Sequence, residues 1–496
     1  MPDATDWESP IERAMEPALF EAHNPSSAAA QYWAVVRQNF LQVRRRHRSA
    51  CSAPAHCCAS RLGGAAELQA LERNAVVAKK RRNVPSRHVP PPTRLPPPAL
   101  LTPLSSTCSA QKPRLSAAFA SQFGTSKAAS ILASLHATPL GSGPGEVDAF
   151  ARRVIAQGGE NPEHEHFYVF DLGAVLARWR VWTTSLPRVV PHYAVKCNPD
   201  PAMLALLGAL GTGFDCASPF EIELVRAMGV PADQRIIYAH CCKQRRDLQF
   251  AKTVGVTLTT FDTEAELTKI KEHHPECGLV LRIRADDPAA RCNLGDKYGA
   301  EEDEIEPLLR EAKSLGLDVA GISFHVGSGA RNPAAFPIAV AKARQAFDLA
   351  RSMGFNMRLL DLGGGYSGNL TEGITMEAVA ASLNSALEEF FPSQEGVRVI
   401  AEPGRYFAEP GMTLHTRIFG KRVREGRPNV DSRYYWISDG VYGSMNCQIY
   451  DHAELSVHPF PALKPEAGQE DKACLPSTLY GARTPCARGG THELVF

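Results

Sequence analysis

Short apolar runs alternate with longer amphipathic runs between about His166 and Tyr406. The short runs are rich in β-branched and aromatic residues, which is typical of buried strands. The nine runs that predict strands are HFYVFDL, VVPHYAVK, TGFDCAS, RIIYAH, TLTTFD, LVLRIRA, VAGISFHVG, RLLDLGGG and VRVIAEPG. The longer runs between them predict helices, because their apolar residues recur three and four positions apart.

The predicted helices carry start and stop signals. The clearest candidates are LGAVLARWRVWTTSL, PFEIELVRAMG, EAELTKIKEHH and FPIAVAKARQAFDLARSMG. Thr263 and Glu266 have the spacing of a capping box at the start of the third candidate. Glycines stand where helices should end, at Gly229, Gly255, Gly316 and Gly354.

Eight or nine βα units in a row predict parallel strands joined by right-handed crossovers. A doubly wound sheet and a (β/α)8 barrel both satisfy this pattern. The span of about 240 residues fits the barrel, and the polar and glycine residues gather at strand carboxyl ends, where barrel active sites lie. We therefore expect an α/β protein with a TIM-like barrel over residues 166–406.

The pattern changes after Tyr406. RYYWISDG and NCQIYDH predict antiparallel strands, so a second, β-rich domain is expected at residues 407–481. Residues 116–165 are interpreted as a lead-in that contributes to this β domain.

The first 115 residues differ in composition from this body. Residues 44–114 contain fourteen Lys or Arg and two Glu, a net +12 in a chain of net charge +1. With the proline clusters of VPPPTRLPPP, this composition predicts a low-complexity, disordered extension. KKRR (Lys79–Arg82) matches nuclear signals and nucleic-acid patches, but a solvated basic tail is the better explanation, and no nucleic-acid partner is expected.

Cysteine usage and hydropathy predict a cytoplasmic protein without a membrane partner. The thirteen cysteines follow no repeating spacing, and the adjacent pairs Cys57/Cys58 and Cys241/Cys242 fit neither a disulfide framework nor a zinc site, so no metal is predicted. The most apolar stretch, near 201–211, is too short to span a bilayer. The first residues, MPDATDWESP, are acidic and polar, unlike a signal peptide.

Candidate chemistry lies at the ends of the predicted strands. Lys196 ends PHYAVK, where its amine can bond covalently to an aldehyde cofactor. His325, in SFHVGSG, can lie flat against an aromatic ring, because the glycines after it let backbone approach closely. Taken singly, a solvated lysine and a core histidine are the commoner explanations.

The remaining candidates fit the other parts of one cofactor. Gly363–Gly365 can offer backbone N–H groups to a phosphate, and Arg405 can pair with it bidentately. Glu402 can face a pyridine nitrogen and keep it protonated. A plain turn and a surface ion pair would explain each motif alone, but one site explains all of them together.

These motifs resemble a known family. YAVKCN, GTGFDCAS, SFHVGSG, LDLGGGY, AEPGRY and DGVYGSMNCQIYDH, spread over residues 167–453, are similar to those of the eukaryotic ornithine decarboxylases. These belong to the fold type III decarboxylases that use pyridoxal 5′-phosphate (PLP), the ornithine, diaminopimelate and arginine decarboxylase group. The resemblance implies an alanine-racemase-like barrel and a modified Greek-key β domain, which would be truncated here.

The resemblance also assigns roles to residues. It implies that Lys196 carries PLP, that His325 stacks on the ring and that Glu402 meets the ring nitrogen. The phosphate and the surroundings of the lysine would involve Ser328, Gly363, Gly364, Gly365, Pro403, Gly404, Arg405, Asp215, Glu221 and Arg282. Tyr450 and Asp451 would bind the substrate, with Asp451 taking its distal amine in the site of the partner subunit of a homodimer with shared active sites.

The substrate is predicted to be a basic amino acid. A buried cationic terminus needs a carboxylate partner such as Asp451. Ornithine and lysine differ by one methylene, which discriminates by only about 1–3 kcal/mol. The overall likeness therefore selects ornithine, decarboxylated to putrescine and CO2. Lysine remains an alternative, and diaminopimelate would need an arginine-rich distal site.

The chain departs from the family pattern in two places. After Gly481 the divergent tail of residues 482–496 lacks the family's Gly-Pro-Thr-Cys-Asp motif, whose cysteine donates a proton and whose aspartate helps bind substrate; Cys486 is not assigned to that role. AHCCK at Ala239–Lys243 replaces the usual ANPCK. A non-catalytic relative that binds an antizyme-like regulator is the alternative, but such relatives tend to lose cofactor residues.

Overall fold

The computed structural model describes residues 138, 140, 145–158, 166–368, 374–424, 432–453, 455–458, 460, 476–481 and 493–495. The predicted extension over residues 1–115, the basic Lys79–Arg82 segment and Cys486 lie outside the described residues.

Eight parallel strands close into a barrel in the order in which they occur along the chain. They are β2 (Val189–Ala194), β3 (Gly213–Cys216), β4 (Ile236–Tyr238), β5 (Leu258–Phe261), β6 (Gly278–Arg282), β7 (Val319–Ser323), β8 (Leu359–Asp361) and β9 (Arg398–Ala401). The pairing of β2 with β9, which places Val190 opposite Ile400, closes the barrel. A doubly wound sheet has two open edges, so the predicted TIM-like barrel is confirmed.

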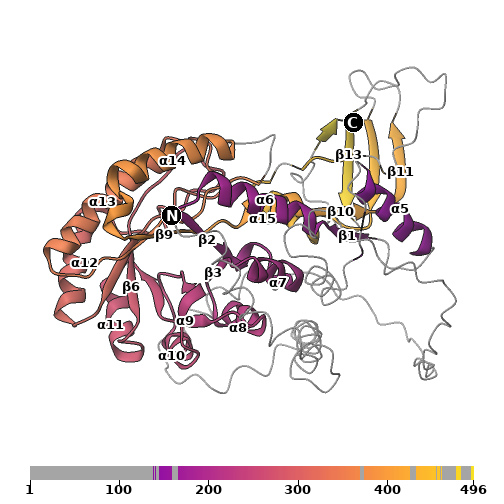
Figure 1. Cartoon of the computed structure of the whole chain (residues 1–496). Helices are drawn as coiled ribbons and strands as arrows, with labels where there is room; N and C mark the ends of the chain where they lie inside the picture. Colours follow the sequence, from indigo (N-terminus) through magenta and orange to yellow (C-terminus); the bar gives the residue numbers. More distant parts are fainter. Residues whose placement is uncertain are drawn as a thin grey trace, which may run out of the picture. The chain divides into compact units, whose positions relative to one another are not determined.

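Helices surround these strands (Figure 1). They are α6 (Leu172–Ser185), α7 (Pro201–Ala209), α8 (Pro219–Ala227), α9 (Ala232–Arg235), α10 (Arg245–Thr253), α11 (Glu264–His273), α12 (Glu302–Ser314), α13 (Ala335–Ser352) and α14 (Met376–Phe390). The strand residues that face the helices, such as Ile236 and Tyr238, belong to the main hydrophobic core. Ile237, between them, belongs to a small separate cluster that fills the inside of the barrel, with Val280, Leu359 and Ile400.

The first of the nine predicted strands lies outside the barrel. β1 (His166–Phe170) pairs antiparallel with β10 (Met412–Thr416) instead. Within β1 only Val169 is buried, whereas all four residues of β3 are buried. A strand with one solvated face suits an antiparallel pair, and a strand of a parallel barrel must be buried on both faces. The closed barrel therefore begins at Val189 and not at 166.

A four-stranded sheet follows β10 in the chain. Its order is β11 (Ile418–Arg424), β12 (Ser432–Ile437), β13 (Pro476–Gly481) and β14 (Glu493–Val495). β12 and β13 run parallel, and the two outer pairs are antiparallel. The predicted RYYWI strand is present as β12, and three residues of the divergent tail pair with β13. The C-terminal sheet domain is thus present.

The predicted NCQIYDH strand is wrong. That segment forms the short helices η6 (Ser444–Asn446) and α16 (Cys447–Tyr450). The carboxylate of Asp439 accepts hydrogen bonds from the backbone N–H groups of Gly440 (2.7 Å) and Ser444 (3.0 Å). These bonds turn the chain tightly before Asn446, and extended backbone cannot form them.

The remaining helices of the described residues are α5 (Glu146–Gly158), η3 (Val195–Cys197), η4 (Ser393–Glu395), α15 (Arg405–Ala408) and η5 (Glu409–Gly411).

The predicted helix signals are confirmed with one difference. Gly229, Gly255, Gly316 and Gly354 have positive φ after α8, α10, α12 and α13. The Thr263 hydroxyl accepts from the Glu266 N–H (3.3 Å), as in a capping box. The Glu266 carboxylate does not complete the box; it pairs with Lys243 and Lys269. Because the Lys243 side chain is fully buried, its amine needs this acid as a partner.

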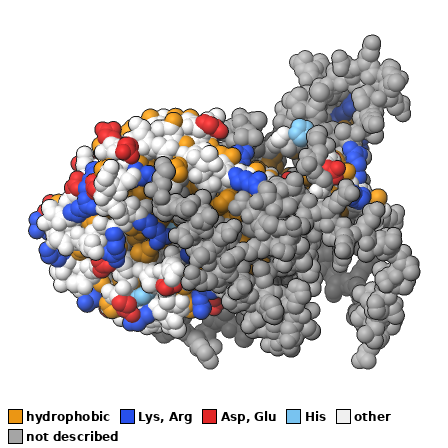
Figure 2. Space-filling model, viewed as in Figure 1, with side chains coloured by type: hydrophobic (Ala, Val, Ile, Leu, Met, Phe, Trp, Pro, Cys, Tyr) orange, Lys and Arg blue, Asp and Glu red, His pale blue; other side chains and the backbone are white. Residues whose placement is uncertain are grey.

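The visible face of the described barrel carries acidic and basic side chains interspersed with one another (Figure 2). In the described part of the chain, we find no helix with the length and hydrophobicity needed to cross a bilayer.

One buried histidine makes the stability of the barrel depend on pH. His192, in β2, lies against Gly213, where an added Cβ would come within 2.5 Å of the ring. Burial, with the nearby Arg398 cation, lowers the pKa of His192 to about 3. In the unfolded chain histidine titrates near 6.5, so the unfolded state binds the proton first as pH falls. The stabilisation that the neutral His192 ring gives to the folded state is therefore complete above about pH 6.5, and it is lost as the pH falls from that value to about 3.

His192→Gln should remove this dependence. We expect the wild type to lose roughly 2 kcal/mol of unfolding free energy between pH 7 and pH 5 from this group, and the variant to lose none of it. Urea unfolding at the two pH values measures the difference, with the exposed His458→Gln as matched control. An equal pH dependence in wild type and His192→Gln would contradict the assignment.

Candidate active site

The predicted site residues lie at the carboxyl ends of the barrel strands. Lys196 follows β2, Asp215 lies near the end of β3, and Arg282 ends β6. His325 follows β7, and Glu402 directly follows β9. Parallel strands of a closed barrel end at one rim, so these side chains share one mouth.

The amine of Lys196 contacts the Oδ2 atom of Asp215. The Asp215 side chain is fully buried, whereas that of Lys196 is 51% exposed in the open mouth. Burial lowers the pKa of Lys196, but the carboxylates of Asp215 and Glu402 outweigh it and the pKa is raised. The lysine is therefore held as a cation by the acid beside it.

Glu221 lies close to Asp215 and Lys196. Its carboxylate accepts from Ala217 N–H (2.7 Å) and from the Ser218 hydroxyl (3.1 Å) at the start of α8. Burial raises the pKa of Glu221, and the nearby Asp215 carboxylate adds to the rise. Glu221 thus organises the loop after β3 next to Asp215.

The Gly363–Gly365 segment packs tightly against the His325 segment. Gly363 has φ +59°, and an added Cβ would overlap the Phe324 carbonyl oxygen. A Cβ on Gly364 would fall 2.6 Å from Nε2 of His325. Only glycine permits this approach, so no side chain from residues 363 and 364 occupies this part of the mouth.

His325 is a neutral imidazole. Burial lowers its pKa well below the usual value, and the Arg282 cation lowers it further. Its Nδ1 accepts from the Gly327 N–H (3.0 Å), which leaves the proton on Nε2. An uncharged, flat ring at this position suits stacking on an aromatic cofactor.

Arg405 is the most heavily bonded cation of the site. Its guanidinium donates to the Ser328 hydroxyl (2.6 and 3.1 Å), to Glu409 (2.6 Å) and to both carboxylate oxygens of Asp451 (2.8 and 3.2 Å). Arg405 and Ser328 are thus brought together, as predicted for two phosphate-holding groups. Glu409 is a partner that the sequence did not reveal.

Pro403 and Gly404 support the Lys196 turn. The Pro403 carbonyl accepts from Ala194 N–H (3.2 Å). A Cβ on Gly404 would lie 3.1 Å from the Cβ of Cys197. Their contacts are with the segment that carries the lysine, and a side chain at 404 would displace it.

Glu402 and Asp361 form a buried acid pair. Glu402 is 9% exposed, Asp361 is fully buried, and their side chains lie within hydrogen-bonding reach. Burial raises the pKa of Glu402 well above its usual range, with Asp361 and Asp215 adding to the rise. The positive charge of Arg282 acts against this rise in both acids. The Arg282 guanidinium itself lies 5.1 Å from the centre of the Tyr298 ring. Asp361 was not predicted as a site residue, although a single acid within the apolar strand run RLLDL could have indicated one.

Asp451 lies in the site of its own chain. Besides Arg405, its carboxylate approaches Arg291 (3.7 Å) and the Cys292 thiol (3.8 Å). The resemblance implied that Asp451 reaches a partner subunit's site, and this role stays a prediction for a homodimer. Within its own chain, α16 ends with the Asp451 N–H bonded to the Cys447 carbonyl (2.9 Å), which leaves the carboxylate free for Arg405.

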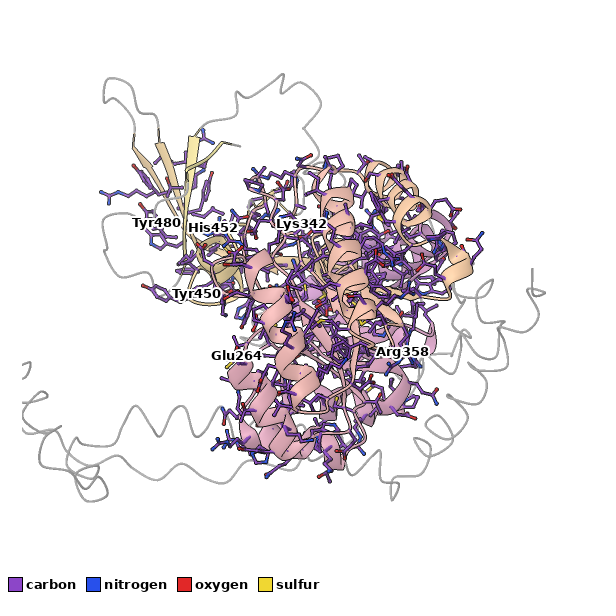
Figure 3. All side chains as sticks on the ribbon, turned by 90° about the vertical axis from the view of Figure 1, so that its left-hand side faces the viewer. Glu264, Lys342, Arg358, Tyr450, His452 and Tyr480 are labelled. Carbon is purple, nitrogen blue, oxygen red and sulfur yellow. The ribbon has the colours of Figure 1, made fainter. Side chains whose placement is uncertain are left out.

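Tyr450 is not brought into this cluster. Its side chain is 81% exposed (Figure 3). Arg291 and Cys292 contact the cluster but were not predicted, because their partners Glu409 and Asp451 are far away in the sequence. Glu409 lies four residues after Arg405 and was not predicted either.

The donor set fits PLP. Lys196 offers an amine, the glycine segment offers a cradle that side chains would fill, and Glu402 offers an acid. Arg405 and Ser328 add a guanidinium and a hydroxyl that are held together by two hydrogen bonds.

Comparison with known proteins identifies the family. Residues 172–409 match the model of the pyridoxal-dependent decarboxylase, pyridoxal binding domain. The chain is 45% identical over 326 residues to the chloroplastic ornithine decarboxylase of Nicotiana glauca, covering 64% of this chain and 72% of the relative. It is 44% identical over 328 residues to the ornithine decarboxylase of Mus musculus, covering 64% and 70%.

Solved structures agree. The arginine decarboxylase of Paramecium bursaria Chlorella virus is 39% identical with a TM-score of 0.63, covering 71% of this chain and 90% of its own. The lysine/ornithine decarboxylase of Vibrio vulnificus is 27% identical with a TM-score of 0.61, covering 71% and 89%.

The chain therefore belongs to the pyridoxal-dependent decarboxylases, in the fold type III group that contains the ornithine decarboxylases. Its cofactor is PLP, and the predicted decarboxylase class is confirmed.

Proposed function

We propose that this chain decarboxylates L-ornithine to putrescine and CO2. The observation that carries this proposal is an acid, Asp451, beside a PLP-type mouth that contains Lys196 and Glu402. Asp451 is suited to the distal ammonium of a basic amino acid. The curated relatives named above are ornithine decarboxylases, which supports ornithine within that class.

Each residue then has a physical task. Gly363–Gly365, Ser328 and Arg405 would hold the phosphate, and the neutral ring of His325 would pack on the cofactor ring. When bound, PLP supplies an electron sink for the electrons left by the departing carboxylate. Glu402 would stabilise a proton on the ring nitrogen, and Asp215 would position the amine of Lys196 through their ion pair.

Substrate choice tests this proposal. We expect kcat/KM for CO2 release to be highest with ornithine, and about 10- to 200-fold lower with lysine, which is longer by one methylene. Arginine and diaminopimelate complete the panel, the latter because Arg291 lies 3.7 Å from Asp451. A preference for any substrate other than ornithine would contradict the proposed reaction.

Asp451→Asn tests the distal site. The amide keeps the shape of the side chain but loses the charge that pairs with the substrate ammonium. The Asp451 side chain is 38% exposed, so water weakens its attraction for the substrate ammonium and the loss of binding should be smaller than for a fully buried ion pair. We expect KM for ornithine to rise roughly 10- to 100-fold, with a smaller change in kcat.

Steady-state kinetics with ornithine measures this effect, and Asp348→Asn is the matched control. Asp348 is an exposed acid on α13 that pairs with Arg344, so its variant should keep the wild-type KM. An unchanged KM in Asp451→Asn would remove Asp451 from the substrate site.

We also propose a homodimer in a cytoplasmic setting. The apolar side chains of Tyr442, Ile449 and Tyr450, close in sequence to Asp451, are each exposed, which supports a surface that a second copy covers. Seven cysteines of the described chain are free thiols, in keeping with a reducing compartment. A non-catalytic, antizyme-binding role is not favoured, because the lysine, the acid and the glycine cradle are all retained.

A further inference from the structure

Asp361 and Glu402 are held together by the backbone of two neighbouring strands. Asp361 ends β8, and Glu402 follows β9. The Leu362 N–H donates to the Ile400 carbonyl (2.9 Å), and the Glu402 N–H donates to the Gly363 carbonyl (2.7 Å). These bonds fix the register, so neither acid can withdraw from the other without breaking the barrel rim.

The two oxygens of Asp361 have different surroundings. Oδ1 accepts from the Gly363 N–H (2.9 Å). Oδ2 is buried and receives no N–H or O–H donor from the part of the chain that the structure describes. The side chain within hydrogen-bonding reach is the carboxyl group of Glu402, which is an acceptor when ionised. A proton between the two groups would give both a hydrogen bond.

The excess of negative charge around Asp361 and Glu402 also favours a proton bound between them. Three buried or nearly buried acids, Asp215, Asp361 and Glu402, lie near two cations, Lys196 and Arg282. Lys196 already pairs with Asp215, which leaves one cation for two acids.

One neutral group also borders the pair. Tyr366 lies near both acids, with its hydroxyl buried and its pKa raised by burial and by their charges, so it adds no positive charge. Two like charges this close and this buried do not both ionise.

We infer that Asp361 is a positioning residue, which holds one proton and donates it in a hydrogen bond to Glu402, so that Glu402 meets the PLP ring nitrogen as a carboxylate. This inference rests on the proposed function, because it assigns Glu402 to that nitrogen. Burial raises the pKa of Asp361 to about 7 and that of Glu402 well above its usual range, in keeping with one proton retained by the pair near neutral pH. The proton is not consumed in the reaction.

Infrared spectroscopy of the protein without PLP tests where the proton resides. We expect the carbonyl stretch of a neutral carboxylic acid at pH 6, its loss as pH rises through about 7, and its absence in Asp361→Asn. Glu221→Gln is the control, since Glu221 is a site acid outside the pair whose pKa burial also raises, and its variant should keep the band. A band that survives in Asp361→Asn would overturn the inference.

Stability gives a second readout without the cofactor. The folded state keeps the Asp361 proton to a higher pH than the unfolded chain does, because the pKa is raised from 3.8 to about 7. This contribution is present at low pH and is lost as pH rises through about 7, opposite in sign to that of His192. Wild type should therefore lose stability relative to Asp361→Asn between pH 4 and pH 7, and a constant difference would contradict the inference.

Kinetics separate positioning from a merely structural role. The asparagine amide can donate to Glu402 and accept from Gly363 N–H, so Asp361→Asn should keep kcat within about 3-fold of wild type. Asp361→Ala loses a hydrogen bond to a charged group, and kcat should fall roughly 10- to 100-fold with KM little changed.

Equal losses in the asparagine and alanine variants, at matched melting temperatures, would overturn the inference. Failure of the proposed function would appear separately, as a different substrate preference with the infrared band unchanged.

Discussion

Replacing Lys196 with alanine should abolish the visible absorbance of enzyme-bound PLP and lower kcat for CO2 release by more than about 1000-fold. The amine next to Asp215 is the proposed covalent anchor for the aldehyde at the barrel mouth, and alanine cannot bond to it. Absorbance titration with PLP measures the anchor, and CO2 release from labelled ornithine measures the reaction.

Lys271→Ala is the matched control. Lys271 lies exposed on α11, so removing its amine should leave both the absorbance and the rate unchanged. A Lys196→Ala protein that keeps the lysine-bound absorbance would show that another amine carries PLP.

Replacing Glu402 with glutamine should lower kcat by about 100- to 1000-fold and change KM for ornithine little. A neutral amide cannot stabilise a proton on the ring nitrogen, so the ring becomes a weaker electron sink. The step that releases CO2 should therefore slow, whereas substrate binding should change little. Single-turnover decarboxylation with saturating PLP isolates that step.

The control for this change is Glu389→Gln, an exposed acid on α14. A Glu402→Gln rate within about 3-fold of wild type would remove Glu402 from the ring nitrogen, and Asp361 would then have no carboxylate to position.

The barrel could be predicted because its strands are short apolar runs that alternate with amphipathic helices. Eight of the nine predicted strands form it. The error at β1 has a physical origin, because periodicity describes the burial of a strand but not its pairing partner, which for β1 is the distant β10. NCQIYDH was misjudged because the local hydrogen bonds that Asp439 accepts from Gly440 and Ser444 turn the chain just before it, and hydrophobic periodicity does not describe such bonds.

The site was predictable where a residue ends a strand. Lys196, His325 and Glu402 could be placed at one mouth, because parallel barrel strands end at the same rim. Contacts across the rim were not predictable. The pairing of Asp361 with Glu402 depends on the register of β8 and β9, and that of Arg405 with Asp451 depends on the turn into α16.

Reduction with borohydride followed by peptide mass mapping tests the central claim most directly. The reagent fixes PLP to whichever amine carries it, independently of substrate or turnover. We predict one phosphopyridoxyl group per chain, on the peptide that contains Lys196. A label on a different lysine, or a chain left unlabelled at saturating PLP, would contradict a cofactor held at this end of the barrel.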